Sequence, residues 1–134
     1  MVCTYCGSKL KTTNSRHLAR SNGTWRRKKC NNCNKIFTTI ELSDYKLSWL
    51  VNKNDKLTPF NRDLLFISIF NSLKHRNSAI NEASELSVTV INKIQSDITD
   101  AVINVKKIKE ITYNCLKNFD FVASIQYKAY YIDK

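Results

Sequence analysis

Two cysteine pairs with identical spacing constrain this chain more than any other feature of its sequence. They are Cys3-x-x-Cys6 and Cys30-x-x-Cys33, and they use four of the five cysteines. A two-residue gap lets both thiolates of a tight turn face one tetrahedral ion, and four thiolates leave no open position for a catalytic water. We therefore predict a closed structural metal site. Zinc is the expected ion, and a disulfide pairing or an iron–sulfur cluster is the alternative.

The segments around the cysteine pairs predict a small β-sheet. Gly7 and Asn34 directly follow the two pairs and readily adopt the left-handed backbone of such turns. Residues 24–29 and 35–42 are predicted strands, the second because its side chains alternate with a period of two. A unit of about 40 residues rarely folds on its own core, so the metal is expected to hold this sheet together. His17 is a spare candidate ligand, more simply explained as a surface or phosphate-contact residue.

Positive charge is concentrated in the first third of the chain. Residues 1–42 contain nine Lys or Arg and one acidic residue, Glu41, which gives a net charge of +8, against +11 for the whole chain. Such an asymmetry predicts a polyanionic partner for this part, nucleic acid in particular. Good solubility or a lysine-rich composition is the alternative explanation.

The run WRRKKC, residues 25–30, leads into the second cysteine pair. Strand alternation would put Arg26 and Lys28 on one face of the sheet and Arg27 and Lys29 on the other. A strand this charged cannot be buried on either side, so beside a rigid metal site it predicts a preorganised phosphate clamp. A solvated edge strand, protected by charge against aggregation, is the alternative.

From residue 43 onward the sequence predicts a mostly helical unit with a short sheet, so the fold class is α+β. A strand is expected at 47–51 and a turn at 52–56. Asn61 is a helix N-cap, and the apolar residues between 64 and 73 predict a central helix. Further helices are expected from apolar residues at helical spacing in the segments 90–102, 108–115 and 121–131.

Two more specific expectations follow from these helical patterns. Cys115 shares an apolar stripe with Ile111, so it is predicted to be a core residue and not a ligand. In the last helix, Val122, Ile125 and Ala129 share one face, with Tyr127, Tyr130 and Tyr131 nearby.

No enzyme constellation is recognisable in the sequence. It has neither a GxxxxGK[ST] nor a GxGxxG phosphate loop. No apolar run approaches the roughly 20 residues of a membrane span, and residues 1–12 do not resemble a signal peptide. A cytoplasmic protein in a reducing compartment, without a membrane partner, is the default expectation.

The order of these segments resembles the NrdR family, bacterial transcriptional repressors of ribonucleotide reductase genes that join an N-terminal zinc ribbon to an ATP-cone domain. The FTT-x-E run directly after the second cysteine pair is the most specific match. The matching segments are NSR at 14–16, WRRKKCNNC at 25–33, FTTIE at 37–41, PFNRD at 59–63, LKHR at 73–76, LKNFD at 116–120 and VASIQYKAYY at 122–131.

This resemblance implies specific roles for residues of both domains, a ribbon over 1–42 and a cone over 43–134. Zinc would be bound by the four paired cysteines. Operator DNA would be contacted by Arg16, Arg26, Arg27 and Lys28, with Trp25 in the place of a family arginine. The cone would bind ATP or dATP near Asn52, Lys53, His75 and Arg76, and the nucleotide would set the homo-oligomeric state and thereby the operator affinity.

Several cone positions depart from the family pattern. Asn52, Leu64, His75 and Gln126 stand where cations are usual, so we expect weak nucleotide binding. One alternative function is therefore a DNA-binding protein whose degenerate cone only oligomerises. Another is a zinc-ribbon protein that binds RNA or RNA polymerase.

Overall fold

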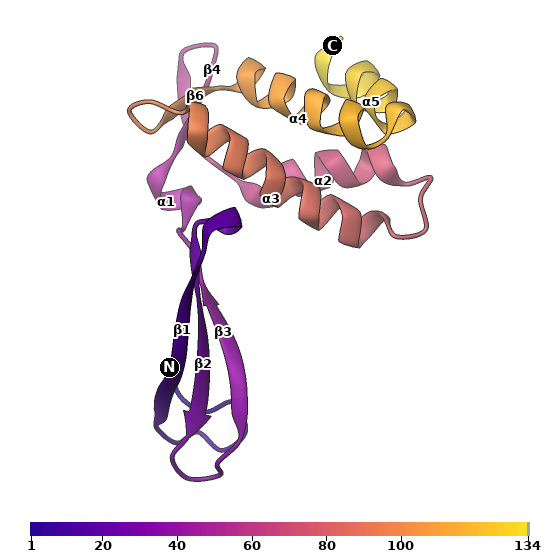
Figure 1. Ribbon diagram of the computed structural model, residues 1–134. Helices are drawn as coiled ribbons and strands as arrows, with labels where there is room; N and C mark the ends of the chain where they lie inside the picture. The colour runs from indigo at the N-terminus through magenta and orange to yellow at the C-terminus, as the bar shows by residue number, and fades with distance from the viewer. Residues whose placement is uncertain (134) are drawn as a thin grey trace. The chain divides into compact units, whose positions relative to one another are not determined.

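A computed structural model of the chain describes residues 1–133. The chain divides into two compact units, a ribbon unit formed by Met1–Ser43 and a helical unit that begins at Asp44 (Figure 1). The predicted α+β class is confirmed, because strands dominate the first unit and helices with a small sheet make up the second.

The ribbon unit is a three-stranded antiparallel sheet in the order β1-β2-β3. Its strands are β1 (Leu10–Leu18), β2 (Gly23–Cys30) and β3 (Ile36–Glu41), and a 3-10 turn (Ala19–Ser21) joins the first two. The predicted strands at 24–29 and 35–42 are confirmed as β2 and β3. The longest strand, β1, has the polar sequence LKTTNSRHL and is exposed along most of its length.

A β-bulge interrupts the pairing of β1 with β2. Thr12 pairs with Lys28 and Asn14 pairs with Arg27. The partners in β2 are adjacent, whereas one residue lies between the two residues of β1. Thr13 is the extra residue, and its hydroxyl donates a hydrogen bond to the carbonyl of Arg27 at 3.2 Å. The bulge therefore reverses the alternation of side chains along β1.

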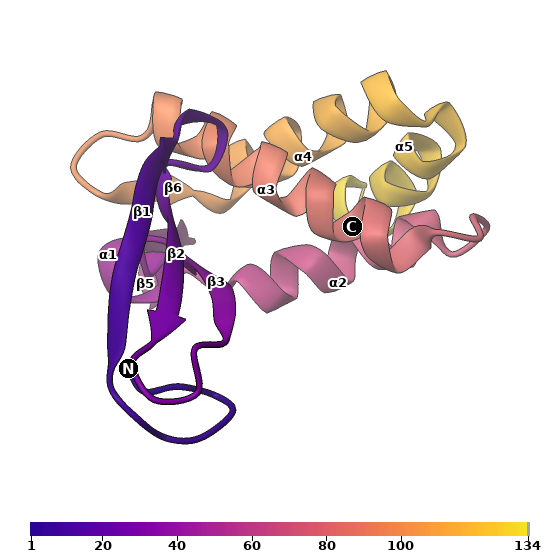
Figure 2. The ribbon, with the colours of Figure 1, turned by 60° about the horizontal axis from the view of Figure 1, so that its bottom comes forward.

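Four main helices and a second small sheet form the helical unit. Helices α2, α3, α4 and α5 pack in turn against one another, and the last closes against the first (Figures 1 and 2). Among residues 1–133, no helix combines the length and the apolar composition needed to cross a lipid bilayer. The elements are α1 (Tyr45–Ser48), β4 (Leu50–Lys53), β5 (Lys56–Pro59), α2 (Arg62–Leu73), α3 (Ala79–Asp97), β6 (Val102–Asn104), α4 (Val105–Phe119), α5 (Phe121–Tyr127) and a terminal π-helix (Lys128–Ile132).

The small sheet has the order β5-β4-β6 and lies at one end of the helices (Figures 1 and 2). β4 and β5 form an antiparallel hairpin, and the third strand runs parallel to β4. Asn54 and Asp55 close the hairpin with positive φ angles of 51° and 61°, inside the predicted turn. The helix and loop segment 60–101 separates the β4–β5 hairpin from β6 in the sequence, and the sheet brings the two together.

Side chains cap the N-termini of three of the four main helices. The Asn61 side chain accepts hydrogen bonds from the backbone N–H groups of the first turn of α2, which confirms the predicted cap. Asn104 caps α4 through the N–H of Lys106 at 2.8 Å. Asp120 caps α5 through the N–H of Ala123 at 3.0 Å. Each cap satisfies backbone donors that the helix itself leaves unpaired.

The apolar core of the described residues lies in the helical unit. Cys115 is buried in it, as predicted. The ribbon unit contributes no residue to this cluster. The core consists of Trp49, Phe60, Leu65, Ile69, Leu73, Ala79, Ala83, Leu86, Val90, Ile91, Ile94, Ile103, Ile111, Cys115, Leu116, Ala123 and Tyr127.

Two predicted elements are wrong at their boundaries. The strand expected at 47–51 starts only at Leu50, because Asp44 accepts a hydrogen bond from the N–H of Lys46 and begins the short helix α1 instead. The helix expected to reach residue 102 ends at Asp97, and Val102 lies in β6. At Val102, pairing with Leu50 of β4 determines the structure of an apolar segment whose spacing alone was ambiguous.

The larger apolar side chains of the last helix do not lie on its buried face. Val122 and Ile125 are 52% and 53% exposed, whereas Ala123, Ser124 and Tyr127 are buried. Helix α2 is not enclosed on all sides either, since Leu64 is 66% exposed. Small residues on the inner face of α5 allow its backbone to approach α2 and α4, and close packing outweighs the larger apolar side chains.

Buried serines are a recurring feature of the helix contacts. Ser72, Ser87 and Ser124 are all at most 1% exposed. Each hydroxyl donates a hydrogen bond to a carbonyl of its own helix, at 3.1, 2.6 and 2.7 Å respectively. The buried hydroxyls are thus satisfied without a partner on the neighbouring helix.

Candidate functional site

The four paired cysteines converge at one end of the ribbon sheet. Their sulfur atoms all lie within 4.8 Å of one another. Cys3 Sγ is 3.7 Å from Cys33 Sγ, and Cys6 Sγ is 3.5 Å from Cys30 Sγ. A disulfide requires about 2.05 Å, whereas a tetrahedron with Zn–S bonds of about 2.3 Å separates its sulfurs by about 3.8 Å. The four thiols therefore fit a tetrahedral metal ion.

The two turns that carry the thiols have matching backbone geometry. Cys3 N donates to the carbonyl of Ser8 at 2.9 Å, and Cys30 N donates to the carbonyl of Lys35 at 3.0 Å, each five residues further on. Gly7 has a φ of 71° and Asn34 a φ of 56°, which confirms the left-handed backbone predicted after each pair. His17 lies outside the cluster, in β1.

Backbone and side-chain donors prepare some of the thiols for deprotonation. Hydrogen bonds from Ser8, first from its side chain and then from its backbone, lower the pKa of Cys6 to about 6. The backbone N–H of Cys33 lowers the pKa of Cys30. The pKa of Cys33 is raised to about 11, because burial and the neighbouring thiols outweigh the lowering hydrogen bond from the Lys35 backbone. A metal must displace a proton there, so metal uptake releases protons.

The register of the ribbon sheet sorts its cations onto two faces. Arg26 faces Ser15 in β1 and Thr39 in β3, and its face also carries Lys28 and Glu41. Contacts agree with this assignment. Arg26 Nη2 lies 3.0 Å from Glu41 Oε2, and Lys28 Nζ lies 3.5 Å from Thr12 Oγ1.

The opposite face carries Arg16, Trp25, Arg27 and Lys29. The guanidinium carbon of Arg16 lies 4.7 Å from the centre of the Trp25 ring, its cross-strand partner. Arg27 pairs with Asn14, and Lys29 pairs with Lys11. The predicted DNA-binding residues are therefore divided, with Arg26 and Lys28 on one face and the other three on the opposite face.

A second candidate site is a cavity of about 400 Å³ in the helical unit. It lies between the small sheet and helices α2 and α4, and tyrosines from the end of the chain complete its wall. Lys53 and Lys109 are the cations that line it. Its other lining residues are mostly apolar: Val51, Thr58, Pro59, Phe60, Asn61, Leu64, Leu65, Ile67, Ser68, Val105, Ile108, Tyr127 and Tyr131.

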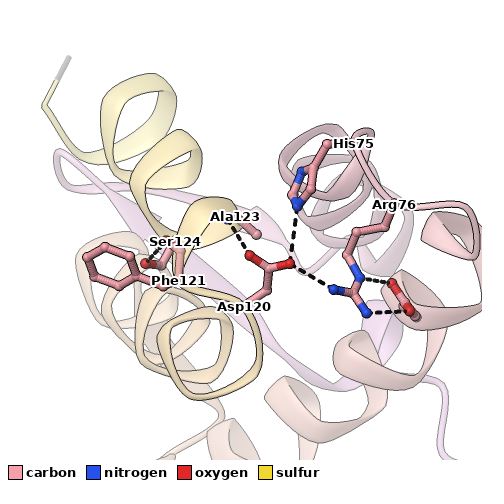
Figure 3. Close-up of polar contacts among 7 residues, drawn as sticks. His75, Arg76, Asp120, Phe121, Ala123 and Ser124 are labelled. Atoms are coloured by element: carbon pink, nitrogen blue, oxygen red, sulfur yellow. Dashed lines mark hydrogen bonds and ion pairs between the residues drawn. The ribbon is translucent and has the colours of Figure 1, made fainter.

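The four predicted nucleotide residues do not meet at this cavity. Lys53 lines it, and the neighbouring Asn52 instead accepts a hydrogen bond from the N–H of Asp55 at 3.0 Å in the hairpin turn. His75 and Arg76 lie in the segment that follows α2 and contact Asp120. Figure 3 shows the Asp120 carboxylate between Ala123 on one side and His75 and Arg76 on the other.

Comparison with known proteins found a family model that matches the ribbon unit and relatives that match nearly the whole chain. A family model described as "Transcriptional repressor NrdR-like, N-terminal domain" matches residues 1–41. The chain is 31% identical to "Transcriptional repressor NrdR" of Psychrobacter arcticus, over 99% of its own length and 88% of that protein. The chain belongs to the NrdR family. Proteins of the same name from Anaplasma phagocytophilum and Clostridioides difficile are 30% and 29% identical, over 99% and 98% of this chain and 87% and 85% of their own length.

Sequence analysis did not predict several residues of the ribbon's basic surface and of the cavity. Lys11 shares a face with Arg27 and Lys29, but it lies in a polar strand without a periodic signal. Lys109 reaches the cavity from α4, more than 50 residues after Lys53. Only the tertiary structure places these residues. By contrast, the doubled cysteine spacing was sufficient to find the four thiols.

Proposed function

We propose that this chain is a zinc-dependent transcriptional repressor of ribonucleotide reductase genes. In this proposal the ribbon, residues 1–42, binds operator DNA, with zinc held by Cys3, Cys6, Cys30 and Cys33. The cone, residues 43–134, binds ATP or dATP, and the nucleotide sets the homo-oligomeric state and hence the operator affinity. The observation that carries the proposal is a strongly basic sheet joined to a four-thiol cluster in a chain of a repressor family.

The ribbon sheet has properties that suit a duplex. Its central strand is the cationic one, and both of its faces are solvent-accessible because no helix of the ribbon unit covers them. A narrow antiparallel sheet of this kind can lie against the phosphate backbone or enter a major groove about 12 Å wide. The metal fixes the strand that carries the cations, so little conformational entropy is lost on binding.

The first test compares polyanions. We expect the zinc-loaded full-length chain to bind duplex DNA at low salt with an affinity that falls as salt rises, because each neutralised phosphate contributes about −0.9 to the slope of log K against log salt. Binding to single-stranded RNA of equal length is expected to be weaker, since Trp25 is already stacked with Arg16. Fluorescence anisotropy with labelled duplex and RNA at several salt concentrations measures both. Tighter binding to RNA would favour the RNA-binding alternative.

The size and lining of the cavity are compatible with the proposed nucleotide binding, although few cations line it. Its volume lies within the range of small-molecule sites, and tyrosines and Phe60 offer apolar and aromatic surface to a base. Burial raises the pKa of Tyr127, so its hydroxyl stays protonated. Lys53 and Lys109 could meet a triphosphate. Leu64, exposed at this cavity, adds apolar surface where the family usually has a cation.

The second test concerns nucleotide affinity. We expect ATP and dATP to bind more weakly than a dissociation constant of about 1 μM, because each absent charged hydrogen bond removes roughly 1.5–3 kcal/mol. Lys53→Ala and Lys109→Ala should each weaken binding about tenfold further. Lys56→Ala is a matched control, because Lys56 pairs with Lys53 across the hairpin but does not line the cavity.

Isothermal titration calorimetry of the full-length chain, followed by native mass spectrometry, separates the remaining alternatives. Submicromolar binding that Lys53→Ala leaves unchanged would refute the assignment of these two lysines. No detectable binding, with oligomers still present, would favour the alternative in which the cone only oligomerises. The apolar lining of the cavity is the observation behind that alternative.

A further inference from the structure

The bulge at Thr13 decides which cations of the ribbon act together. Lys11 and Arg16 are five residues apart, so an unbroken strand would place them on opposite faces. Because Thr13 is an extra residue, Lys11 pairs with Lys29 and Arg16 pairs with Trp25, and all four positions belong to one face. We call this face, with Lys11, Arg16, Arg27 and Lys29, the basic face.

The opposite face has a different charge balance. It carries Arg26 and Lys28 together with Glu41, the acidic residue of the ribbon strands. Its formal charge is therefore +1, against +4 on the basic face. We call it the glutamate face. Exposure separates the two faces in the same sense as charge, because all four cations of the basic face are exposed whereas Arg26 and Lys28 are half-buried.

Arg26 is held by its carboxylate partner. Its Nε and Nη2 donate hydrogen bonds to Glu41 Oε2 at 3.1 and 3.0 Å, and Nη1 is 3.5 Å from Ser15 Oγ. To bind a phosphate, Arg26 would have to give up these contacts while the Glu41 carboxylate repelled the same phosphate. Within residues 1–133, none of the four cations of the basic face has a carboxylate partner.

The basic face also positions its cations for a duplex. The guanidinium carbon of Arg16 lies 4.7 Å from the centre of the Trp25 ring, a contact that restricts where this cation can point. Between Lys11 and Arg16 the strand extends about 15 Å, which exceeds the major-groove width of about 12 Å. Cations at the two ends can therefore reach phosphates on both sides of a groove.

We infer that a nucleic-acid duplex docks on the basic face of the ribbon sheet and not on the glutamate face. This inference rests on the proposed DNA-binding function and specifies its surface. Lys11 and Lys29 join Arg16 and Arg27 as contact residues. Arg26 and Lys28 face away from the duplex, and the Arg26–Glu41 pair stays intact in the complex.

Adjacent residues of β2 provide matched pairs for the test. Arg27→Ala and Arg26→Ala remove the same charge from neighbouring positions, as do Lys29→Ala and Lys28→Ala. The change in net charge is therefore equal within each pair. Arg26→Ala also releases Glu41, whereas Lys28 has no carboxylate partner in the described residues, so the pair Lys29→Ala and Lys28→Ala isolates direct contact more cleanly. The probe is a duplex of mixed sequence of about 30 base pairs, roughly three helical turns. Anisotropy titrations of the zinc-loaded full-length variants are run at several salt concentrations.

We expect Arg27→Ala and Lys29→Ala to weaken binding about five- to tenfold each and to reduce the salt slope by about 0.9. Arg26→Ala and Lys28→Ala should stay within about twofold of wild type with an unchanged slope. Zinc content and circular dichroism confirm that each variant is folded, and Arg27→Gln replaces Arg27→Ala if that variant loses metal.

The outcomes separate this inference from the function on which it rests. Equal losses within both pairs, or larger losses for Arg26→Ala and Lys28→Ala, would overturn the choice of face while leaving DNA binding intact. A wild-type chain that does not bind the duplex at low salt would overturn the proposed function and this inference together.

Discussion

Replacing Cys30 by serine is expected to unfold the ribbon unit and leave the helical unit folded. Cys30 is fully buried, and Cys3 is the other buried hydrophobic residue of Met1–Ser43. The ribbon strands expose Ile36 and Ile40 and have no apolar core of their own. Metal binding must then supply most of the folding free energy, on the order of 10 kcal/mol for a structural zinc site.

Elemental analysis and hydrogen-exchange mass spectrometry measure the two parts of this prediction. Cys30→Ser, or chelation of the wild type, should abolish stoichiometric zinc and remove exchange protection from β1, β2 and β3. Protection in α3 and α4 should persist, because their core contains no residue of the ribbon. Cys115→Ala is the control, since it alters a buried thiol of the helical unit and should keep one zinc per chain. A zinc-free ribbon that stays protected would refute the prediction.

Asp120→Ala is expected to destabilise the helical unit by about 3 kcal/mol. The carboxylate caps α5 through the N–H of Ala123 at 3.0 Å and accepts from Arg76 Nη1 at 2.9 Å and His75 Nε2 at 3.1 Å (Figure 3). Loss of an N-cap costs about 1 kcal/mol, and hydrogen bonds to charged groups add roughly 1.5–3 kcal/mol. Arg76 keeps its bidentate contact with Glu82, which limits the loss.

The pH dependence of stability provides an independent readout of the same carboxylate. The Ala123 backbone N–H, with His75 and Arg76, lowers the pKa of Asp120 from 3.8 to about 2. A depressed pKa stabilises the fold fully above the unfolded value, so this contribution, about 2 kcal/mol, is present above about pH 4 and is lost as pH falls toward 2. The stability difference between wild type and Asp120→Ala should shrink over that range.

Urea unfolding monitored by tryptophan fluorescence at pH 7 and at lower pH values measures both effects, because Trp49 is buried in the helical core. Glu85→Ala is a matched control that removes an exposed carboxylate from α3 and should change stability by less than about 0.5 kcal/mol. If Asp120→Ala unfolds at the same urea concentration as Glu85→Ala, the cap and its ion pairs contribute nothing measurable.

Sequence reasoning succeeded where the signal is local. The cysteine pairs, the left-handed residues after them, the Asn61 cap and the buried Cys115 each depend on spacing within one or two turns of chain. It failed where a distant segment decides. Val102 joins a strand because it pairs with Leu50, and the inner face of α5 is set by how closely small residues approach other helices. Arg76 and Asp120 are 44 residues apart, so no local pattern connects them.

The same distinction applies to the candidate sites. The composition of residues 25–30 predicted a cationic strand, but the partner of Arg26 and the position of Lys11 depend on register. Register in turn depends on one bulge in a strand that has no hydrophobic pattern. The cavity lining combines residues from β4 to Tyr131, and of the four predicted nucleotide-binding residues only Lys53 belongs to it.

The buried serines of the helices have a consequence for motion within the helical unit. Because Ser72, Ser87 and Ser124 each bond to a carbonyl of their own helix, these bonds travel with the helix when it slides or rotates as a rigid rod. Such a displacement breaks none of them and leaves no buried hydroxyl unsatisfied. Its free-energy cost then comes from apolar packing and from the side-chain bonds between elements, such as that from Asn71 Nδ2 to Tyr131 Oη at 3.3 Å. The contacts of Asp120 with His75 and Arg76 join the end of α2 to the start of α5, so these two ends are linked by side-chain bonds as well as by packing.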